Sequence, residues 1–381
     1  MRQPLKELAA ICAGQGAPQG DHNYCENGTP FVKAGNLQEL LEGKAITSIQ
    51  KVSDEVAKKH KLRLYPKGTI LFAKSGMSCM KGYIYVLPQS AYVVSHLACI
   101  TPNEDISEYL RYYFNYHKPN QLVKDAAYPS ISLSDVGNLV VDMKPESERN
   151  EIVSVLQHTE SIITLRQQQL QKLNELVKAR FLEMFGDPVV NKKGWDAEIL
   201  NNLCNGIGDG LHGTPEYDDA GKYAFINGNN LMNGAIEVTP STKMVNAETF
   251  GKYYIEISEN AILLSINGTL GKLAFYNGEE IILGKSACYC NLKSEINREF
   301  VYGVMQTNAF SNFLERNATA STIKNVGLKA IREFRLILPP EGLQKQFVNF
   351  SKQVDKSKAV AQKALDEAQL LFDSLMQKYF G

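Results

Sequence analysis

The sequence contains two copies of one pattern, separated by about 195 residues. Residues 145–186 align without a gap to residues 340–381, and both segments begin with Pro-Glu and end with Phe-Gly. Upstream, with a few residues of slippage, the copies match at FVKAGNL (31–37) with FINGNNL (225–231), TILFAKSG (69–76) with AILLSING (261–268), and Ile11-Cys12 with Leu203-Cys204. Solenoid repeats have periods of roughly 20–50 residues. The longer period here predicts a duplicated domain, and therefore two related modules.

Each copy ends in a long segment with the spacing of an amphipathic helix. Apolar residues recur every three or four positions over residues 146–185 and 342–380, which predicts two helices, each about 60 Å long. Gly186, followed by Asp187-Pro188, suits the end of the first helix. The positions expected to form the core of a helix pair are Ile152, Leu156, Ile163, Leu170, Leu173, Val177, Phe181, Phe347, Val354, Ala361, Leu365, Ala368, Phe372 and Leu375.

One apolar stripe on each of two equally long helices favours pairing in a coiled coil. The first helix leaves module one and leads into module two, whereas the second leaves module two, so we expect an antiparallel pair with pseudo-twofold-related modules at opposite ends. Two independent helices packed on separate domains are the alternative. The expected organisation is a first module (1–145), a central spacer helix (146–187), a second module (188–340) and a C-terminal spacer helix (341–381).

The modules themselves combine short strands with short helices. Runs rich in β-branched and aromatic residues, broken by Gly, Asn and Lys, are typical of strands, and they occur at 68–73, 82–87, 261–266, 272–276 and 280–284. Residues 106–117 and 298–315 have helical spacing instead. The sequence therefore predicts an α+β protein, in which an antiparallel pair of long helices separates two α/β modules.

Composition excludes some classes of protein and leaves others open. Lysine and arginine together equal aspartate and glutamate at 41 each, so the chain lacks the basic excess of a stand-alone DNA-binding protein. No run of 18 apolar residues predicts a membrane span, and the N-terminus does not resemble a signal peptide. The seven cysteines are scattered without a Cys-x-x-Cys pair, which favours reduced thiols. We expect a cytoplasmic protein that does not contact membranes.

The sequence contains partial matches to two enzyme motifs, and neither match is complete. GDGLHG (208–213) fits the glycine pattern of a dinucleotide site, yet Asn-rich sequence precedes it and Thr214-Pro215 follows it, where a strand and a helix are required. Gly284-Lys285-Ser286 resembles the end of a P-loop, but Gly278 lies one residue too far upstream. The six histidines are scattered. We expect no catalytic residue, metal site or cofactor in this chain.

Polar loops follow the hydrophobic runs in both modules. Asn amides can pair with adenine, Lys can pair with guanine or phosphate, and Gly lets the backbone approach closely. A turn is the simpler explanation for any single Asn-Gly or Gly-Thr, but the recurrence of the whole set favours DNA binding. The candidate DNA-binding residues are Lys33, Asn36, Lys74, Ser75, Lys81, Ser130, Asn227, Asn229, Asn230, Asn267, Thr269, Lys272, Lys285, Ser321, Thr322 and Lys324.

With these motifs in order, the chain resembles the specificity subunit of Type I restriction-modification systems over essentially its whole length. The resemblance is carried by KLNELVKARFLEMFGDP (172–188), DGLHGTPEY (209–217), FINGNNL (225–231), SINGTLGK (265–272) and ILPPEGLQKQF (337–347). The first module departs from it, since AGQGAPQGDHNYCENGTPF (13–31) lacks the Gly-x-x-x-Thr-Pro spacing of 210–215 and SGMSCMKG (75–82) replaces SINGTLGK.

The resemblance implies a non-catalytic subunit with two target-recognition domains, each recognising half of an asymmetric, bipartite double-stranded DNA site. The helices would set the spacing and dock two methyltransferase subunits and two restriction subunits. S-adenosylmethionine, ATP and Mg²⁺ would then be bound by those partners, which methylate adenine at N6 and cleave DNA. Partner subunits that enclose the duplex could also supply the phosphate contacts that the neutral charge of this chain does not.

Two other interpretations stay open from the sequence. The chain could be a coiled-coil scaffold that binds only proteins, which its neutral charge favours and its Asn, Lys, Ser and Thr loops oppose. It could also be a solitary enzyme acting on nucleic acid, which the missing acid–base, metal and nucleophile motifs oppose. Adjacent methyltransferase and helicase-nuclease genes would favour the specificity subunit over both.

Overall fold

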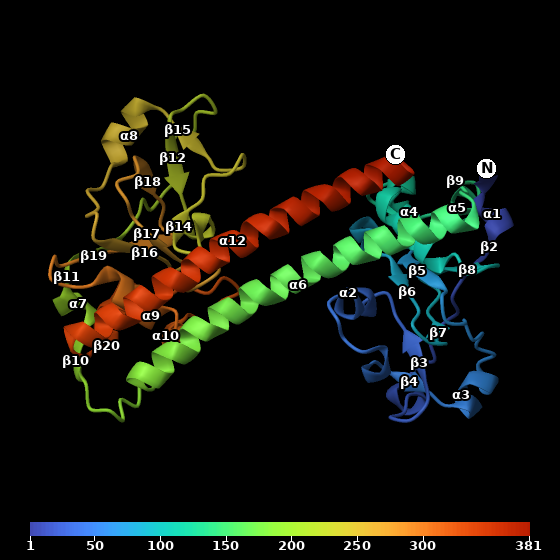
Figure 1. Cartoon of the computed structure of the whole chain (residues 1–381), viewed down its shortest axis with the longest axis horizontal. Coiled ribbons are helices and arrows are strands. Elements are labelled where there is room, and N and C mark those ends of the chain that lie inside the picture. The colour runs from blue at the N-terminus through green and yellow to red at the C-terminus, as the bar shows by residue number, and fades with distance from the viewer. The chain divides into compact units, whose positions relative to one another are not determined.

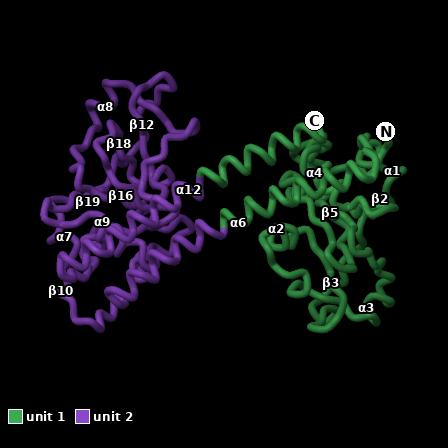
Figure 2. The backbone as a smooth tube through the Cα atoms, viewed as in Figure 1, with its two compact units in different colours: residues 1–167, 363–381 green, residues 168–362 purple.

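The computed structural model describes residues 1–381, and internal packing divides them into two compact units. Unit 1 comprises residues 1–167 and 363–381, and unit 2 comprises residues 168–362. Figure 2 colours the two units separately, and Figure 1 labels their elements. Each unit contains one half of each long helix, so the chain enters unit 2 and returns to unit 1 through helical segments. No helix is both long and apolar enough to cross a lipid bilayer.

Unit 1 is built on a four-stranded antiparallel sheet and a three-stranded mixed sheet. The first has the order β2-β8-β5-β6, and the second has the order β4-β3-β7, with β3 and β7 parallel. A short β1-β9 pair joins the two ends of the domain. The elements are β1 (Arg2–Pro4), α1 (Leu5–Leu8), β2 (Ala9–Ala13), β3 (Thr29–Val32), α2 (Asn36–Leu41), β4 (Lys51–Val52), α3 (Asp54–Lys59), β5 (Ile70–Ala73), β6 (Tyr85–Val86), β7 (Tyr92–Val93), β8 (Leu97–Pro102), α4 (Ser107–Tyr116), α5 (Leu133–Gly137) and β9 (Val140–Asp142).

Unit 2 repeats this topology strand for strand. Its sheets have the orders β11-β19-β16-β17, β15-β12-β18 and β10-β20, with β12 and β18 parallel, and a β13-β14 hairpin is added. The predicted duplication and the α+β fold class are therefore confirmed. The elements are β10 (Asp196–Ile199), α7 (Leu200–Leu203), β11 (Cys204–Asp209), β12 (Tyr223–Ile226), β13 (Leu231–Met232), β14 (Ala235–Ile236), β15 (Met244–Val245), α8 (Ala247–Tyr253), β16 (Ala261–Ser265), β17 (Leu273–Phe275), β18 (Ile281–Leu283), β19 (Ala287–Leu292), α9 (Arg298–Met305), α10 (Asn308–Asn317), α11 (Leu328–Glu333) and β20 (Arg335–Leu338).

One predicted alignment between the copies is wrong. Ile11-Cys12 does not correspond to Leu203-Cys204, because α1 ends at Leu8 and α7 ends at Leu203, each directly before the first strand of the large sheet. Leu8-Ala9 is the true counterpart, at the same offset as the long helices. Ile11-Cys12 and Leu203-Cys204 match only because each is an apolar residue followed by cysteine. The helical stretch predicted over 298–315 is also two helices, because Thr307 caps a new one at its side-chain oxygen.

The two predicted long helices are confirmed as α6 (Glu146–Phe185) and α12 (Glu341–Phe380). Gly186 ends α6 with a φ of 77°, a left-handed conformation that glycine adopts without steric cost. In unit 1 the beginning of α6 shares a core with the end of α12, through Ile152 and Phe380. In unit 2 the end of α6 shares a core with the beginning of α12. The two helices are therefore antiparallel.

Clusters of aromatic side chains pack the long helices against each domain. In unit 2 the Phe347 ring lies 5.4 Å from Phe181 and 5.8 Å from Phe185, measured between centroids, and Phe300 of α9 lies 5.3 Å from Phe185. In unit 1 Tyr109 of α4 lies 5.2 Å from Phe380 in the equivalent arrangement. The same helix of each domain thus packs on the same end of the repeated long helix.

Burial along the predicted stripe is uneven. Positions near the helix ends join the domain cores, whereas Ala361, near the middle of α12, is only 1% exposed without belonging to either core. The buried positions are Ile152, Leu156, Val177, Phe181, Phe347, Val354, Ala361 and Ala368, and the half-buried ones are Ile163, Leu170, Leu173, Leu365, Phe372 and Leu375.

We expect Phe347→Ala to destabilise unit 2 by roughly 3–5 kcal/mol, because it leaves a cavity among three aromatic rings. Val360→Ala is the control, since Val360 lies on the same helix and is 72% exposed. Denaturant unfolding can be followed by the fluorescence of Trp195, the single tryptophan, whose Nε1 donates to the Phe185 carbonyl at 2.9 Å. Equal unfolding midpoints for the two variants would contradict this role of Phe347.

Candidate nucleic-acid interface

The pairing of two parallel strands brings the polar loops of unit 2 together. Ile226 at the end of β12 pairs with Leu283 at the end of β18, so the loops that follow both strands leave the sheet at one edge. There the Ser286 hydroxyl donates to the Asn227 side-chain oxygen at 2.8 Å and accepts from the Gly228 backbone N–H at 2.9 Å. Two loops whose bonded residues, Asn227 and Ser286, are 59 positions apart in sequence are thereby held together.

The loop after β16 joins the same edge. Ser265 pairs with Ala287 across the large sheet, and its hydroxyl accepts from the Lys272 backbone N–H at 2.8 Å and donates to the Thr269 carbonyl at 2.7 Å. Asn267 then bridges to Asn325, which adds the 319–325 segment. One serine therefore closes the SINGTLGK loop at both ends.

All ten candidate residues of unit 2 consequently lie in one group of connected loops. The segments in it are 227–230, 266–272, 284–286 and 319–325, joined by the strand ends and bridges just described. The candidates so gathered are Asn227, Asn229, Asn230, Asn267, Thr269, Lys272, Lys285, Ser321, Thr322 and Lys324.

Within this group the side chains divide into those that build the loops and those that face solvent. The Asn230 amide accepts from the Asn227 N–H at 3.0 Å and donates to the Glu237 carbonyl at 2.9 Å and the Thr242 hydroxyl at 3.0 Å. Asn229 is exposed and its amide makes no hydrogen bond within the chain. Asn230 is thus a structural residue, whereas Asn229 is available to a ligand.

The lysines divide in the same way. Lys285 is exposed with its ammonium group unpaired, so it can approach a base or a phosphate. Lys324 is held in an ion pair with Glu315 at 2.5 Å, and the Lys272 ammonium lies 3.4 Å from the Asn229 carbonyl oxygen. Of the three, Lys285 is the most available to a ligand.

A histidine–carboxylate pair that sequence patterns missed lies beside this group. Leu211 bridges to Gly284, and next to it the His212 Nε2 lies 2.6 Å from an Asp209 carboxylate oxygen, with His212 70% exposed. A Cβ on Gly210 would collide with the Leu283 carbonyl, so only glycine allows this approach. The Asp-x-x-His spacing of the loop was the available signal, but it has meaning only once Leu211 is known to pair with Gly284.

Unit 1 builds the same loop scaffold from different residues. The Lys33 N–H donates to the Asn36 side-chain oxygen at 2.9 Å, as Asn227 does to Asn230. Ser75 bridges to Ser130, as Asn267 does to Asn325, and the Ser75 hydroxyl lies 2.8 Å from His96 Nδ1. The structure thus gives counterparts to loops whose sequences differ strongly between the copies.

Gly14 is the counterpart in unit 1 of Gly210, although the first loop of unit 1 does not have the motif spacing of residues 210–215. A Cβ there would collide with the Val94 carbonyl, as at Gly210 in unit 2, and the neighbouring Gln15 bridges to Val94. Lys74 lies in the same group, where its backbone bonds to His96 and Ile131. Lys81 does not join it, because its ammonium is directed to Gln38 at 3.4 Å and it lines a separate cleft.

Cys99 and Tyr109 are titratable groups of the unit 1 core with raised pKa values. Burial raises the pKa of the Cys99 thiol to about 12 and that of the Tyr109 hydroxyl to about 12, so both are protonated and unreactive at neutral pH. No three His, Cys, Asp or Glu side chains meet in a geometry suited to a metal. The chemistry available at the loops is hydrogen bonding and charge pairing.

The chain thus consists of two related domains, each with a group of connected polar loops. The chain belongs to the family described as "Type I restriction modification DNA specificity domain", which it matches over residues 2–175 and again over 193–369. The two matches correspond to the two copies of the repeat, and the recognition of the family from its motifs is confirmed.

Individual relatives agree with this assignment. The chain is 26% identical over 179 residues to the Type I restriction enzyme MjaIX specificity subunit of Methanocaldococcus jannaschii, an alignment that covers 45% of this chain and 40% of that relative. Its fold resembles the Type I restriction-modification S subunit of M. genitalium (TM-score 0.55, 13% identity, 100% and 96% coverage). It also resembles a chain in a structure that describes the assembly and conformational transition of the type I R-M system. The TM-score is 0.58 at 16% identity, with 100% of this chain and 97% of that chain covered. At these identities the structural likeness concerns the fold.

We expect Asn230→Ala to loosen the 227–242 loop of unit 2. The substitution leaves the Asn227 N–H, the Glu237 carbonyl and the Thr242 hydroxyl without their partner. Each unsatisfied group costs about 1–3 kcal/mol where it is buried. Asn229→Ala is the matched control, one residue away, and removes no intramolecular side-chain bond. Hydrogen exchange of the backbone amides at Asn227 and Thr239 measures the difference. If exchange were as fast in N229A as in N230A, the separation of the two roles would be wrong.

Proposed function

We propose that this chain is the DNA-recognition subunit of a Type I restriction-modification complex and binds an asymmetric, bipartite double-stranded DNA site. The observation that supports this most is the construction of one loop scaffold twice with different exposed side chains. Two copies of a domain that kept its backbone and changed its loops suit two different half-sites. A pair of identical loop groups would instead suit a palindrome.

In this proposal unit 2 reads one half-site through its exposed loop residues. Asn229 can make paired hydrogen bonds to adenine, and Lys285 can donate to guanine O6 and N7. The glycines at 210 and 228 lie where backbone segments touch, which keeps the loops rigid and limits the entropy lost on binding. Unit 1 reads the other half-site through the loops around Lys33, Lys74 and Ser75.

The long helices set the distance between half-sites and carry the other subunits. A 40-residue helix is about 60 Å long, more than the 34–36 Å of one DNA turn, which suits half-sites separated by several unread base pairs. Two methyltransferase subunits and two restriction subunits would then bind this chain. S-adenosylmethionine, ATP and Mg²⁺ belong to those subunits in the proposal, and adenine N6 methylation and cleavage are their reactions.

A protein-only scaffold is the competing function. Its one supporting feature is the formal net charge of zero, which gives no attraction to a phosphate backbone by itself. The proposed complex accounts for the same feature, because partner subunits that enclose the duplex contribute phosphate contacts. The two functions differ in whether substitutions in the loops change DNA sequence preference.

We expect Lys285→Ala to weaken binding of the target by about 1–3 kcal/mol if Lys285 contacts a base edge, and to relax preference at one base position. The measurement is the affinity of the complete methyltransferase complex for its target and for single-base variants. Lys329→Ala is the control, a lysine of the same unit that is 87% exposed and lies on α11. Unchanged affinity and preference in K285A would remove Lys285 from the interface.

We expect a shorter tolerated gap between half-sites when both long helices are shortened equally. Deleting residues 162–168 and 357–363, seven at the middle of each helix, removes about 10.5 Å and keeps the apolar stripe in register. At about 3.4 Å per base pair, the preferred gap should shrink by about three base pairs. Methylation of a library of targets with varied gaps measures it. An unchanged gap preference would contradict the spacing role of the helices.

A further inference from the structure

Unit 2 has a polar pocket beside the reading loops, with which it shares Lys272. It lies between the domain and the two long helices, has a volume of about 390 Å³, and is lined by residues of α6, α9, α10, α12 and the β13–β14 and β16–β17 connections. Its lining includes Lys178, Lys272 and Lys358 but no aspartate or glutamate. A concave site lined by lysine side chains, in which the one adjacent carboxylate, Asp355, is already paired with Lys358, favours an anion.

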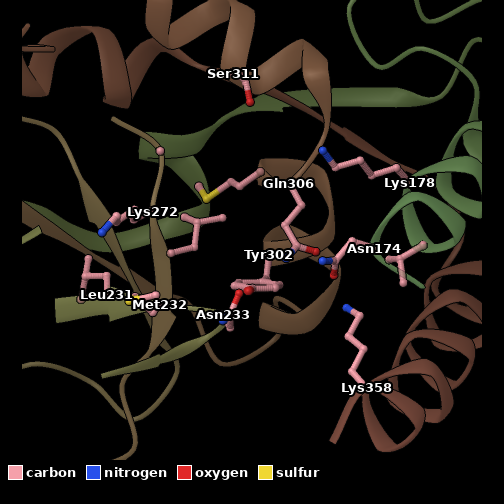
Figure 3. Close-up of a pocket in the computed structure, with 14 residues that line it drawn as sticks. Asn174, Lys178, Leu231, Met232, Asn233, Lys272, Tyr302, Gln306, Ser311 and Lys358 are labelled. Carbon is pink, nitrogen blue, oxygen red and sulfur yellow. The ribbon is translucent and has the colours of Figure 1, made fainter. Parts of the chain in front are cut away.

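The lysines approach this pocket from different elements. Figure 3 shows Lys178 of α6 and Lys358 of α12 extending toward the space beside the Asn174 and Gln306 amides. The Lys358 ammonium is paired with Asp355 at 3.1 Å, so its charge is partly compensated. Lys178 is exposed and makes no ion pair or hydrogen bond within the chain, which leaves its full charge for a ligand.

The duplicated unit 1 provides an internal comparison. Phe300 packs on Phe185 as Tyr109 packs on Phe380, which aligns α4 with α9 and places Arg111 where Tyr302 lies. In the cleft of unit 1 the charge of Arg111 is neutralised by two glutamates. Arg111 donates two hydrogen bonds to Glu160, at 3.1 and 2.8 Å, and a third to Glu108 at 2.7 Å.

Unit 2 keeps a carboxylate at the position of Glu160, where the repeat offset gives Asp355, but that carboxylate is paired with Lys358. Tyr302 replaces the arginine, and at the repeat offset of the long helices Lys178 takes the place of Asp373. Asp373 in unit 1 accepts a hydrogen bond from Gln369 at 3.0 Å and lies on the corresponding part of α12. The cleft of unit 1 is lined by Lys81, Arg111 and Lys118 together with Glu108 and Glu160. The pocket of unit 2 differs because no carboxylate is paired with Lys178 in its wall.

The remaining wall of the pocket supplies hydrogen-bond donors. Burial raises the pKa of Tyr302 to about 12, and the nearby Asp355 carboxylate acts in the same direction, so its hydroxyl is protonated at neutral pH and can donate. The amides of Asn174 and Gln306 and the hydroxyl of Ser311 also line the pocket. Ammonium, amide and hydroxyl donors around one space match the oxygens of a tetrahedral oxyanion.

We propose that this pocket binds a phosphate group, carried by the DNA backbone or by a free phosphate compound. Lys272 and Met232 connect it to the reading loops, because the Lys272 ammonium reaches the Asn229 carbonyl at 3.4 Å and Met232 also lines the cleft around Asn227 and Asn229. This contiguity favours a DNA phosphate next to the half-site read by unit 2, and that source rests on the proposed function.

The test uses Lys178→Gln and Lys358→Gln in the full chain, assembled with its methyltransferase partner for DNA binding and alone for phosphate binding. Lys172→Gln and Lys356→Gln are the matched controls, because each is an exposed lysine on the same helix that does not line the pocket. Lys178→Asp gives unit 2 the residue of unit 1 and should have the largest effect. Trp195 fluorescence confirms that each variant is folded.

In the DNA arm, K178Q should weaken binding equally for target and unrelated sequences and reduce the slope of log affinity against log salt by about 1. In the phosphate arm, calorimetry with inorganic pyrophosphate should show binding that K178Q weakens and K172Q does not. A change in the second arm alone identifies a free phosphate compound as the ligand. If K178Q, K178D and K358Q match their controls in both arms, the pocket is not a phosphate site.

The two proposals fail in distinguishable ways. A wild-type complex that binds target and unrelated DNA equally contradicts the proposed function, while its salt slope and pyrophosphate binding still test the pocket. A complex with normal sequence preference but unaltered lysine variants contradicts the phosphate site alone.

Discussion

The parallel pairing of β12 with β18, and of β3 with β7, is the constraint on which the functional surface depends. A parallel pair brings the ends of two strands to one edge, so the loops that follow them meet although they are distant in sequence. The hydrogen bond between Ser286 and Asn227 then connects those loops in unit 2. The loop after β16 joins them because the Ile266 N–H donates to the Ser286 carbonyl at 2.9 Å. Without this pairing the polar residues would be ordinary turns spread over a domain surface.

Because the domain is duplicated, the two units can be compared to find which contacts the fold requires. Backbone contacts that recur in both units, such as the Lys33–Asn36 and Asn227–Asn230 bonds, are required by the scaffold. Features that differ between the units, such as Arg111 against Tyr302, are free of that requirement and can serve recognition. The phosphate pocket of unit 2 and the sequence preferences of both units are expected among these differences.

The long helices and the duplication could be predicted from sequence. A 3.6-residue period over forty residues and a constant offset between the copies are patterns that extend over many residues. The strand pairing could not be predicted, because β7 and β12 are only two and four residues long and carry no register information of their own. Gly14 was missed for the same reason, since its need arises from Val94, eighty residues away. Separating Asn229 from Asn230 likewise required knowing that Glu237 and Thr242 lie beside Asn230.

The most direct test of the recognition role is genome-wide mapping of N6-methyladenine in a host that expresses this chain with its partner methyltransferase, compared with the same host lacking only this chain. The account predicts methylation at one asymmetric, interrupted sequence that disappears with the chain. Methylation that persists without the chain, or an active methyltransferase that gains no new site from it, would contradict the account and favour the protein-only scaffold.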